Sequence, residues 1–235
     1  MNLSTTTRPV AATLRLRLSA VALAIASAAG TAVAAPPAAD APYLLYLPSN
    51  TTRVDHPAII QAFIDQGFNV RTYAYAGEDD ADYAGRIAGE VRELLAQGVA
   101  PQDINVVGGG TGSAIALLAS AATGNRQVDY VVLGQCDDML KVRYRFRLAG
   151  NVLGIRDAAD AGSGSCRAFW SGAPKLRRQR DLVLHTGHGA ALFDAPRAEW
   201  LQPLVDWTRG GQVEVGAVRV VAEGAGRGQD GSAGR

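Results

Sequence analysis

The chain has 235 residues, with 23 Lys and Arg against 22 Asp and Glu, so it has the length of one domain and is nearly neutral. This balance argues against a nucleic-acid partner and an anionic membrane surface, since both attract proteins through a basic patch. The three histidines lack ligand spacing with acids or cysteines, and we expect no metal site and no cofactor.

The first 34 residues are typical of a signal peptide. They begin with a basic region without acids, continue with an apolar run at 18–29 that is too short to span a bilayer, and end on Ala32-Val33-Ala34, a small-residue cleavage site. We expect cleavage after Ala34 and a secreted or periplasmic protein with no membrane span. Loss of three arginines leaves 20 basic against 22 acidic residues, a net charge of about −2.

Residues 35–41 are expected to link the signal peptide to a domain at 42–209, whose first half alternates strands with helices. Asp55 and Asp79 each precede an apolar stripe at helical spacing, where a carboxylate caps a helix, so we interpret these acids as caps and not as ligands. Gly67 and Gly98 end the two helices. The expected strands are residues 43–47, 68–73 and an apolar run that begins at 103.

The same alternation continues in the second half. The patterns predict strands at 128–133, 151–155 and 181–185 and a helix at about 196–209, followed by a glycine-rich, partly disordered tail at 210–235. Residues 141–147 alternate apolar and basic side chains, which predicts an extended segment with one solvated face and no assigned role. The expected fold class is α/β, with about six mostly parallel strands and helices on both faces of the sheet.

Two cysteines, Cys136 and Cys166, remain in the mature chain. Export to an oxidising compartment would let them form a disulfide across a loop of about 30 residues, worth roughly 2–4 kcal/mol. The alternative is two small, buried hydrophobic side chains.

The glycine cluster at 108–112 lies between a β-branched apolar run and a helix of small apolar residues. This order predicts a strand, a sharp turn and a buried helix, which suits either a nucleotide-binding turn or a nucleophile elbow. A dinucleotide fingerprint belongs in the first strand-helix unit and ends on glycine, whereas this cluster follows the third strand and Ser113 takes the last position. The elbow is therefore favoured.

The loops after successive strands then carry the turn, an acid and a histidine in that order. Residues 106–117, Val-Val-Gly-Gly-Gly-Thr-Gly-Ser-Ala-Ile-Ala-Leu, resemble the V-V-G-x-S-x-G-G-A-x-A-L elbow of the α/β-hydrolase superfamily of serine hydrolases and esterases. The resemblance covers residues 42–209 and implies a three-layer sandwich. It matches Asp160 to the family's acid and His188 to its histidine, and it places residues 46–49 where the family has its oxyanion loop.

The resemblance assigns oxyanion or ligand binding to Ser49, Asn50 and Thr111, the last through its backbone N–H at the helix start. The main departure is Gly110, which stands where the family has its nucleophilic serine. Glycine adopts the strained backbone of that position at little cost, so the turn can survive without the chemistry. The hydroxyls of Thr111 and Ser113 are the two candidates to replace the missing nucleophile.

Two functions remain open at this point. One is a degenerate serine hydrolase that retains the Asp160–His188 pair and binds a small ligand. The other is an active hydrolase of ester-type bonds that uses Ser113, Thr111 or a water activated by His188. We expect His185 to be structural and His56 to have no special role.

Overall fold

The computed structural model describes residues 41–134, 136 and 139–213. The predicted signal peptide, almost all of the predicted linker and most of the glycine-rich tail lie outside these residues and stay predictions. No helix in the described part of the chain is both long and apolar enough to cross a bilayer.

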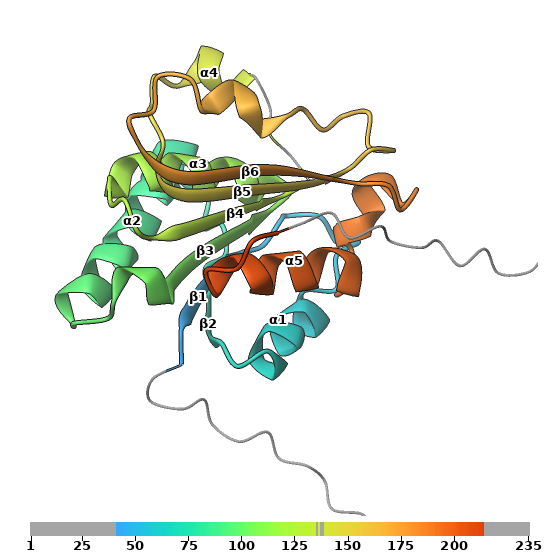
Figure 1. Cartoon of the computed structure of the whole chain (residues 1–235), viewed down its shortest axis with the longest axis horizontal. Helices are drawn as coiled ribbons and strands as arrows, with labels where there is room; N and C mark the ends of the chain where they lie inside the picture. Colours follow the sequence, from blue (N-terminus) through green and yellow to red (C-terminus); the bar gives the residue numbers. More distant parts are fainter. Residues whose placement is uncertain (1–40, 135, 137–138, 214–235) are drawn as a thin grey trace, which may run out of the picture. The chain divides into compact units, whose positions relative to one another are not determined.

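A six-stranded sheet forms the centre of the domain (Figure 1), and its strands run in the order β2-β1-β3-β4-β5-β6. Each adjacent pair of strands is parallel, which confirms the predicted fold class. The strands are β1 (Tyr43–Leu47), β2 (Asn69–Thr72), β3 (Ile104–Gly109), β4 (Asp129–Leu133), β5 (Ala149–Asp157) and β6 (Lys175–Leu184).

Helices cover both faces of the sheet, with α1 and α5 on one side and α2 and α3 on the other (Figure 1). Parallel strands need such crossovers, because the chain must return to the end of the sheet at which the previous strand began before it starts a new one. The α-helices are α1 (His56–Asp65), α2 (Asp80–Ala96), α3 (Thr111–Thr123), α4 (Met139–Arg143) and α5 (Ala198–Thr208), and the 3-10 turns are η1 (Pro101–Asp103), η2 (Cys166–Phe169) and η3 (Gly189–Phe193).

The two predicted helix caps are formed. Asp55 Oδ1 accepts from the Ala58 N–H at 3.0 Å, and Asp79 Oδ1 accepts from the Asp82 N–H at 2.8 Å. Each cap satisfies a backbone donor that has no partner within its helix, a contribution of about 1 kcal/mol.

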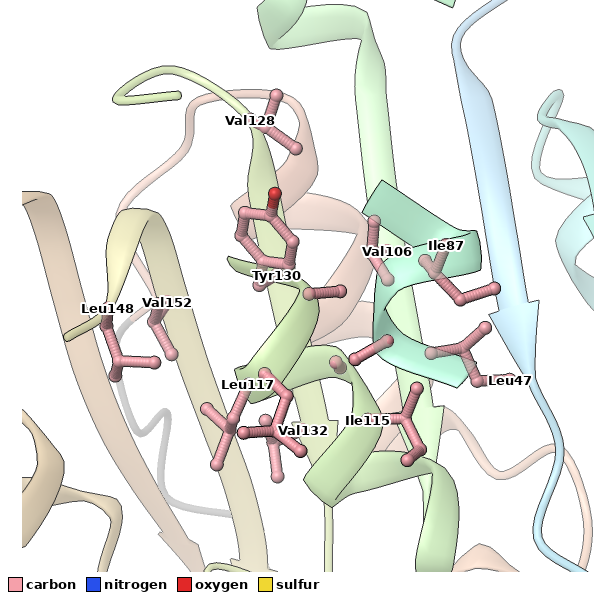
Figure 2. Packing of buried hydrophobic residues seen from close by; sticks show 14 of the residues in the cluster. Leu47, Ile87, Val106, Ile115, Leu117, Val128, Tyr130, Val132, Leu148 and Val152 are labelled. Atoms are coloured by element: carbon pink, nitrogen blue, oxygen red, sulfur yellow. The ribbon is translucent and has the colours of Figure 1, made fainter. Parts of the chain in front are cut away.

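Two hydrophobic cores lie on opposite faces of the sheet. On the α2/α3 face, Ile87, Ile115 and Leu117 pack onto Val106 and Val132 of the strands (Figure 2). On the α1/α5 face, the aromatic rings of Phe63 in α1 and Trp200 in α5 pack against the sheet. Because the inner strands β1, β3 and β4 are buried on both faces, their sequences are mostly apolar and do not alternate.

The structure corrects the predictions for two strands and for one segment between them. β5 runs from Ala149 to Asp157, two residues longer at each end than predicted, and β6 begins at Lys175, six residues before the predicted start. β6 is an edge strand whose first half is largely exposed and charged, so hydrophobicity does not reveal it. Residues 139–143 form helix α4, where an extended segment was predicted from 141; the Tyr144 N–H donates to the Leu140 oxygen at 2.8 Å and closes this turn.

Candidate active site

A cleft of about 470 Å³ opens at the carboxyl ends of the strands. This edge is where parallel α/β sheets place their ligands, because the loops after successive strands converge there. The loops after β1, β3, β4, β5 and β6 all contribute, with Ser49, Asn50, Thr51, Arg53, Val54, Gly110, Thr111, Leu133, Gly134, Asp160, Gly162, Ala190, Phe193 and Asp194.

The turn between β3 and α3 forms one wall of this cleft and depends on its glycines. A Cβ atom on Gly108 would lie 2.1 Å from the Gly112 oxygen, and one on Gly112 would lie 2.2 Å from the Leu47 oxygen. Both positions therefore exclude a side chain, so that the helix can start directly against β1 and β3. Their spacing, two residues on either side of position 110, is that of the G-x-S-x-G elbow.

Gly110 lies at the tip of this turn with φ 52° and ψ −118°. Such a backbone is nearly free for glycine and strained for other residues. A Cβ atom on Gly110 would lie only 2.8 Å from the Ser49 Cβ and 3.7 Å from the Ser49 Oγ. The side chain of Ser49 thus occupies the space that a side chain at position 110 would need.

The Ser49 loop is held in place by His56, to which the sequence assigned no role. His56 Nε2 lies 3.0 Å from the Ser49 carbonyl oxygen, and Nδ1 lies 3.0 Å from the Tyr46 hydroxyl. Because a carbonyl only accepts, Nε2 carries the proton and Nδ1 accepts from Tyr46, whose pKa is raised by burial. The Ser49 Oγ is itself buried and has no hydrogen-bond partner among the described residues.

The two hydroxyls considered as substitute nucleophiles are both engaged elsewhere. Ser113 is fully buried, and its Oγ lies 3.0 Å from the carbonyl oxygens of both Gly108 and Leu133. Thr111 lines the cleft and donates through Oγ1 to the side-chain oxygen of Asn50. Within the described residues, neither hydroxyl is hydrogen-bonded to His188.

The loop after β5 holds two carboxylates in different environments. Asp160 is half-buried, lines the cleft and accepts from the Gly162 N–H at 3.1 Å. Asp157, at the end of β5, is fully buried and accepts from the Ala159 N–H at 2.8 Å, the Thr186 N–H at 3.1 Å and the Thr186 hydroxyl.

Burial alone would raise the pKa of Asp157, but hydrogen bonds from Thr186 and from nearby backbone N–H groups outweigh it and lower the pKa below the ordinary value. Asp157 is therefore the ionised group that joins the loop after β5 to the loop after β6. The sequence signal for it is an acid at the end of a mostly apolar strand.

His188 is exposed at the start of η3, where its backbone N–H lies 3.3 Å from the Thr186 Oγ1. No hydrogen bond or ion pair joins its ring to Asp160 in the described part of the chain. The two loops nevertheless touch, since a Cβ atom on Gly189 would lie 3.5 Å from the Ala159 oxygen. The Asp160–His188 pair stays a prediction. His185, just beyond β6, is exposed.

A disulfide joins Cys136, beyond β4, to Cys166, at the start of η2. Of the two alternatives left open by the sequence, the structure has the disulfide. It closes a separation of 30 residues and cross-links the two segments that carry Gly134 and Asp160 into the cleft. Across the described residues, no group of three or more His, Cys, Asp or Glu side chains is arranged to hold a metal ion.

Comparisons with known proteins support the fold. No protein-family model and no curated protein sequence matches the chain. Among solved structures, a putative carboxylesterase from Lactobacillus plantarum superposes with a TM-score of 0.53 and 14% identity, covering 74% of this chain and 91% of that one. A predicted CIB-like hydrolase from Thermoplasma acidophilum has a TM-score of 0.51 and 13% identity, covering 73% and 88%.

SOBER1 of Arabidopsis thaliana is similar at a TM-score of 0.50 and 11% identity, covering 72% of this chain and 98% of that one. Together with the parallel six-stranded sheet, these likenesses identify the α/β-hydrolase fold. At such low identities they show an architecture shared with hydrolases and esterases, and the chemistry must be argued from the residues of the cleft.

Proposed function

We propose that this protein is a degenerate serine hydrolase that binds a small ligand in the cleft at the carboxyl ends of its strands. The observation that carries the proposal is Gly110. It has the strained backbone of a nucleophile elbow, it lies between the close-packed Gly108 and Gly112, and it has no side chain. We propose that it stands at the nucleophile position of the fold.

The loss of a nucleophile has a large effect on rate. In a serine protease, deletion of the nucleophile lowers turnover by about 10⁶-fold and leaves the modest acceleration that binding and the oxyanion hole provide. The side chain of Ser49 supports the loss of a nucleophile at position 110, because it packs into the space that a side chain there would occupy. The rest of the elbow can then serve binding.

The ligand that suits this cleft carries a carboxylate or carbonyl oxygen on a small apolar body. The oxygen would meet the Thr111 N–H at the start of the 13-residue helix α3, where the helix dipole favours negative charge. Leu133 and Phe193 supply apolar wall, and Arg53 adds a positive charge at the cleft.

We also propose that the protein acts outside the cytoplasm. The amino-terminal pattern predicts export, and the Cys136–Cys166 disulfide suits an oxidising compartment.

The alternative is an active ester hydrolase. Thr111 favours this alternative because it lines the cleft and carries a hydroxyl. His188 favours it because an exposed imidazole can activate water. Ser113 supports it less, because a fully buried hydroxyl bound to two carbonyls does not face the cleft.

The test measures hydrolysis of 4-nitrophenyl acetate and butyrate by the mature protein and its variants. We expect no turnover above buffer for the parent. Hydrolysis by the parent that His188→Ala abolishes would refute the proposal, and hydrolysis that Thr111→Val abolishes would assign the nucleophile to Thr111.

A pair of double variants tests the packing at the elbow. Gly110→Ser alone should stay inactive, because its Cβ would clash with the Ser49 Cβ. Ser49→Gly with Gly110→Ser removes this clash and should gain ester hydrolysis, whereas Ser49→Ala with Gly110→Ser keeps the Cβ and should not. If both double variants gained the same hydrolytic activity, the Ser49 Cβ would not be what blocks position 110.

Binding is tested separately with butyrate as the carboxylate probe. Titration should shift the backbone amide signals of Thr111 and Gly112 in an NMR spectrum and leave those of α2 unchanged. If other amide signals shift to saturation with butyrate while those of Thr111 and Gly112 do not, the ligand binds elsewhere.

A further inference from the structure

A second cavity, of about 520 Å³, lies on the α2/α3 face of the domain. It is separate from the cleft, because Leu148 and Lys175 in its wall stand at the beginnings of β5 and β6, whereas the cleft lies at the strand ends. Its size falls within the range of small-molecule sites in proteins.

The floor of this cavity is apolar and consists mostly of alanine side chains. Ala84 of α2 and Leu118 and Ala121 of α3 contribute to it, and Phe146 forms part of the wall. Small residues on two adjacent helices leave a depression where larger ones would fill the space. An alkyl chain is the kind of group that such a surface takes from water.

The rim of the cavity is cationic. Arg145, Arg147 and Lys175 line it, and none of its lining residues is acidic. Both arginines are exposed, and neither takes part in a hydrogen bond or an ion pair within the described residues. Lys175 Nζ lies near the carboxyl end of α3, 3.3 Å from the position that a Cβ atom on Gly124 would take. The carboxyl end of a helix favours positive charge.

The two arginines are held by the side chains that alternate with them. Tyr144 donates to Asp80 Oδ2 at 3.1 Å, and the ring of Phe146 stacks on that of Phe169 with centroids 5.7 Å apart. These contacts fix the backbone from which Arg145 and Arg147 extend. The sequence pattern at 141–147, which had no assigned role, thus presents positive charge beside an apolar floor.

We propose that this cavity is a binding site for a single amphipathic anion, with its alkyl chain on the small-residue floor and its carboxylate head between Arg145, Arg147 and Lys175. The three cations without acids in the lining favour an anionic head, and guanidinium groups can bind a carboxylate through two parallel hydrogen bonds. The concave floor favours one free chain over a flat lipid surface.

Calorimetric titration of the mature protein with sodium dodecanoate, below its micelle-forming concentration, tests the site. Each buried CH₂ can raise the affinity by up to about fourfold, so dodecanoate should bind far more tightly than hexanoate. A neutral dodecyl maltoside control should bind more weakly than dodecanoate. Exposed charges are screened by salt, so 0.5 M NaCl should weaken binding.

Arg145→Gln with Arg147→Gln should lower the affinity for dodecanoate by about tenfold or more, because two charge-assisted contacts are lost. Ala121→Leu should also weaken binding, because it fills the floor. Arg180→Gln, an exposed arginine of β6 outside the cavity, is the matched control and should leave the affinity unchanged. Thermal unfolding of each variant checks that it is folded.

The proposal is overturned if dodecanoate shows no saturable binding, or if the double arginine variant binds it as tightly as the Arg180→Gln control. The latter result would show that the two arginines do not bind the carboxylate head. Co-sedimentation with vesicles of anionic lipid, combined with no binding of free dodecanoate, would also overturn it in favour of a membrane surface.

Discussion

Asp129, at the start of β4, should make the stability of the fold depend on pH. Its side chain is 4% exposed, its Oδ1 accepts no hydrogen bond among the described residues, and Arg178 Nη2 lies 3.6 Å away. Burial raises the pKa of Asp129 to about 7, and the nearby Arg178 and Asn151 lower it only in part. The folded protein therefore keeps this proton at a pH at which the unfolded chain has lost it.

The sign follows from proton binding. Between about pH 4 and pH 7 the folded state binds one proton more than the unfolded state, so the contribution of Asp129 to stability falls as pH rises through this window. A change from 3.8 to about 7 corresponds to about 4 kcal/mol between the two ends of the window. Asp129→Asn keeps the shape and stays neutral at every pH.

Urea unfolding of the parent and of Asp129→Asn at pH 5 and pH 8 measures this effect, and all other ionisable groups cancel in the comparison. The two proteins should be similar in stability at pH 5, and the variant should be more stable at pH 8 by up to about 3 kcal/mol, because each of the two pH units between 5 and about 7 contributes about 1.4 kcal/mol. A variant that is less stable than the parent at pH 8 would refute the reasoning. It would show that the attraction between Asp129 and Arg178 exceeds the cost of burying the charge.

Three further changes should lower the free energy of unfolding. Replacing Cys136 and Cys166 by serine should cost roughly 2–4 kcal/mol, and dithiothreitol should lower the parent to the same level in urea unfolding; equal stability of oxidised and reduced parent would contradict this. Ser113→Ala should cost about 1 kcal/mol, because it removes the buried hydroxyl that the carbonyl oxygens of Gly108 and Leu133 share as a donor, yet butyrate binding at the cleft should persist; loss of binding in a folded variant would assign Ser113 to the site. Asp157→Asn should cost about 1–3 kcal/mol at pH 7, because Thr186 loses an ionised acceptor. The pKa of Asp157 is lowered on folding, so its contribution is present above the unfolded pKa and is lost on acidification; a difference from parent that stays constant from pH 7 to pH 3 would count against this role.

The local elements of this fold could be predicted from sequence because their signals are local. Asp55 and Asp79 cap helices through bonds to residues three positions away, and the predicted strands are apolar runs because both faces of a parallel sheet are covered. β6 was predicted only in part, since an edge strand is held by backbone bonds to a single neighbour and its exposed half can be charged.

The contents of the candidate site were harder to predict, because they depend on contacts between distant segments. Asp160 follows from the order of the loops, but the buried carboxylate that joins the loops after β5 and β6 is Asp157, which is identified by its bonds to Thr186. His56 had no role in the sequence, yet its ring spans Tyr46 and Ser49.

The sequence by itself determined an α/β chain with a strand, a glycine turn and a helix in hydrolase order, since alternating elements and chain order leave few topologies open. It also determined that position 110 has no side chain. Only the tertiary structure decided what surrounds that position. The Ser49 Cβ fills the space above Gly110, Ser113 is buried against two carbonyls, and the disulfide joins two loops of the cleft. The contacts of Ser49 with Gly110, of Ser113 with Leu133 and of Cys136 with Cys166 join loops of different strands, which neighbour one another only in the folded sheet.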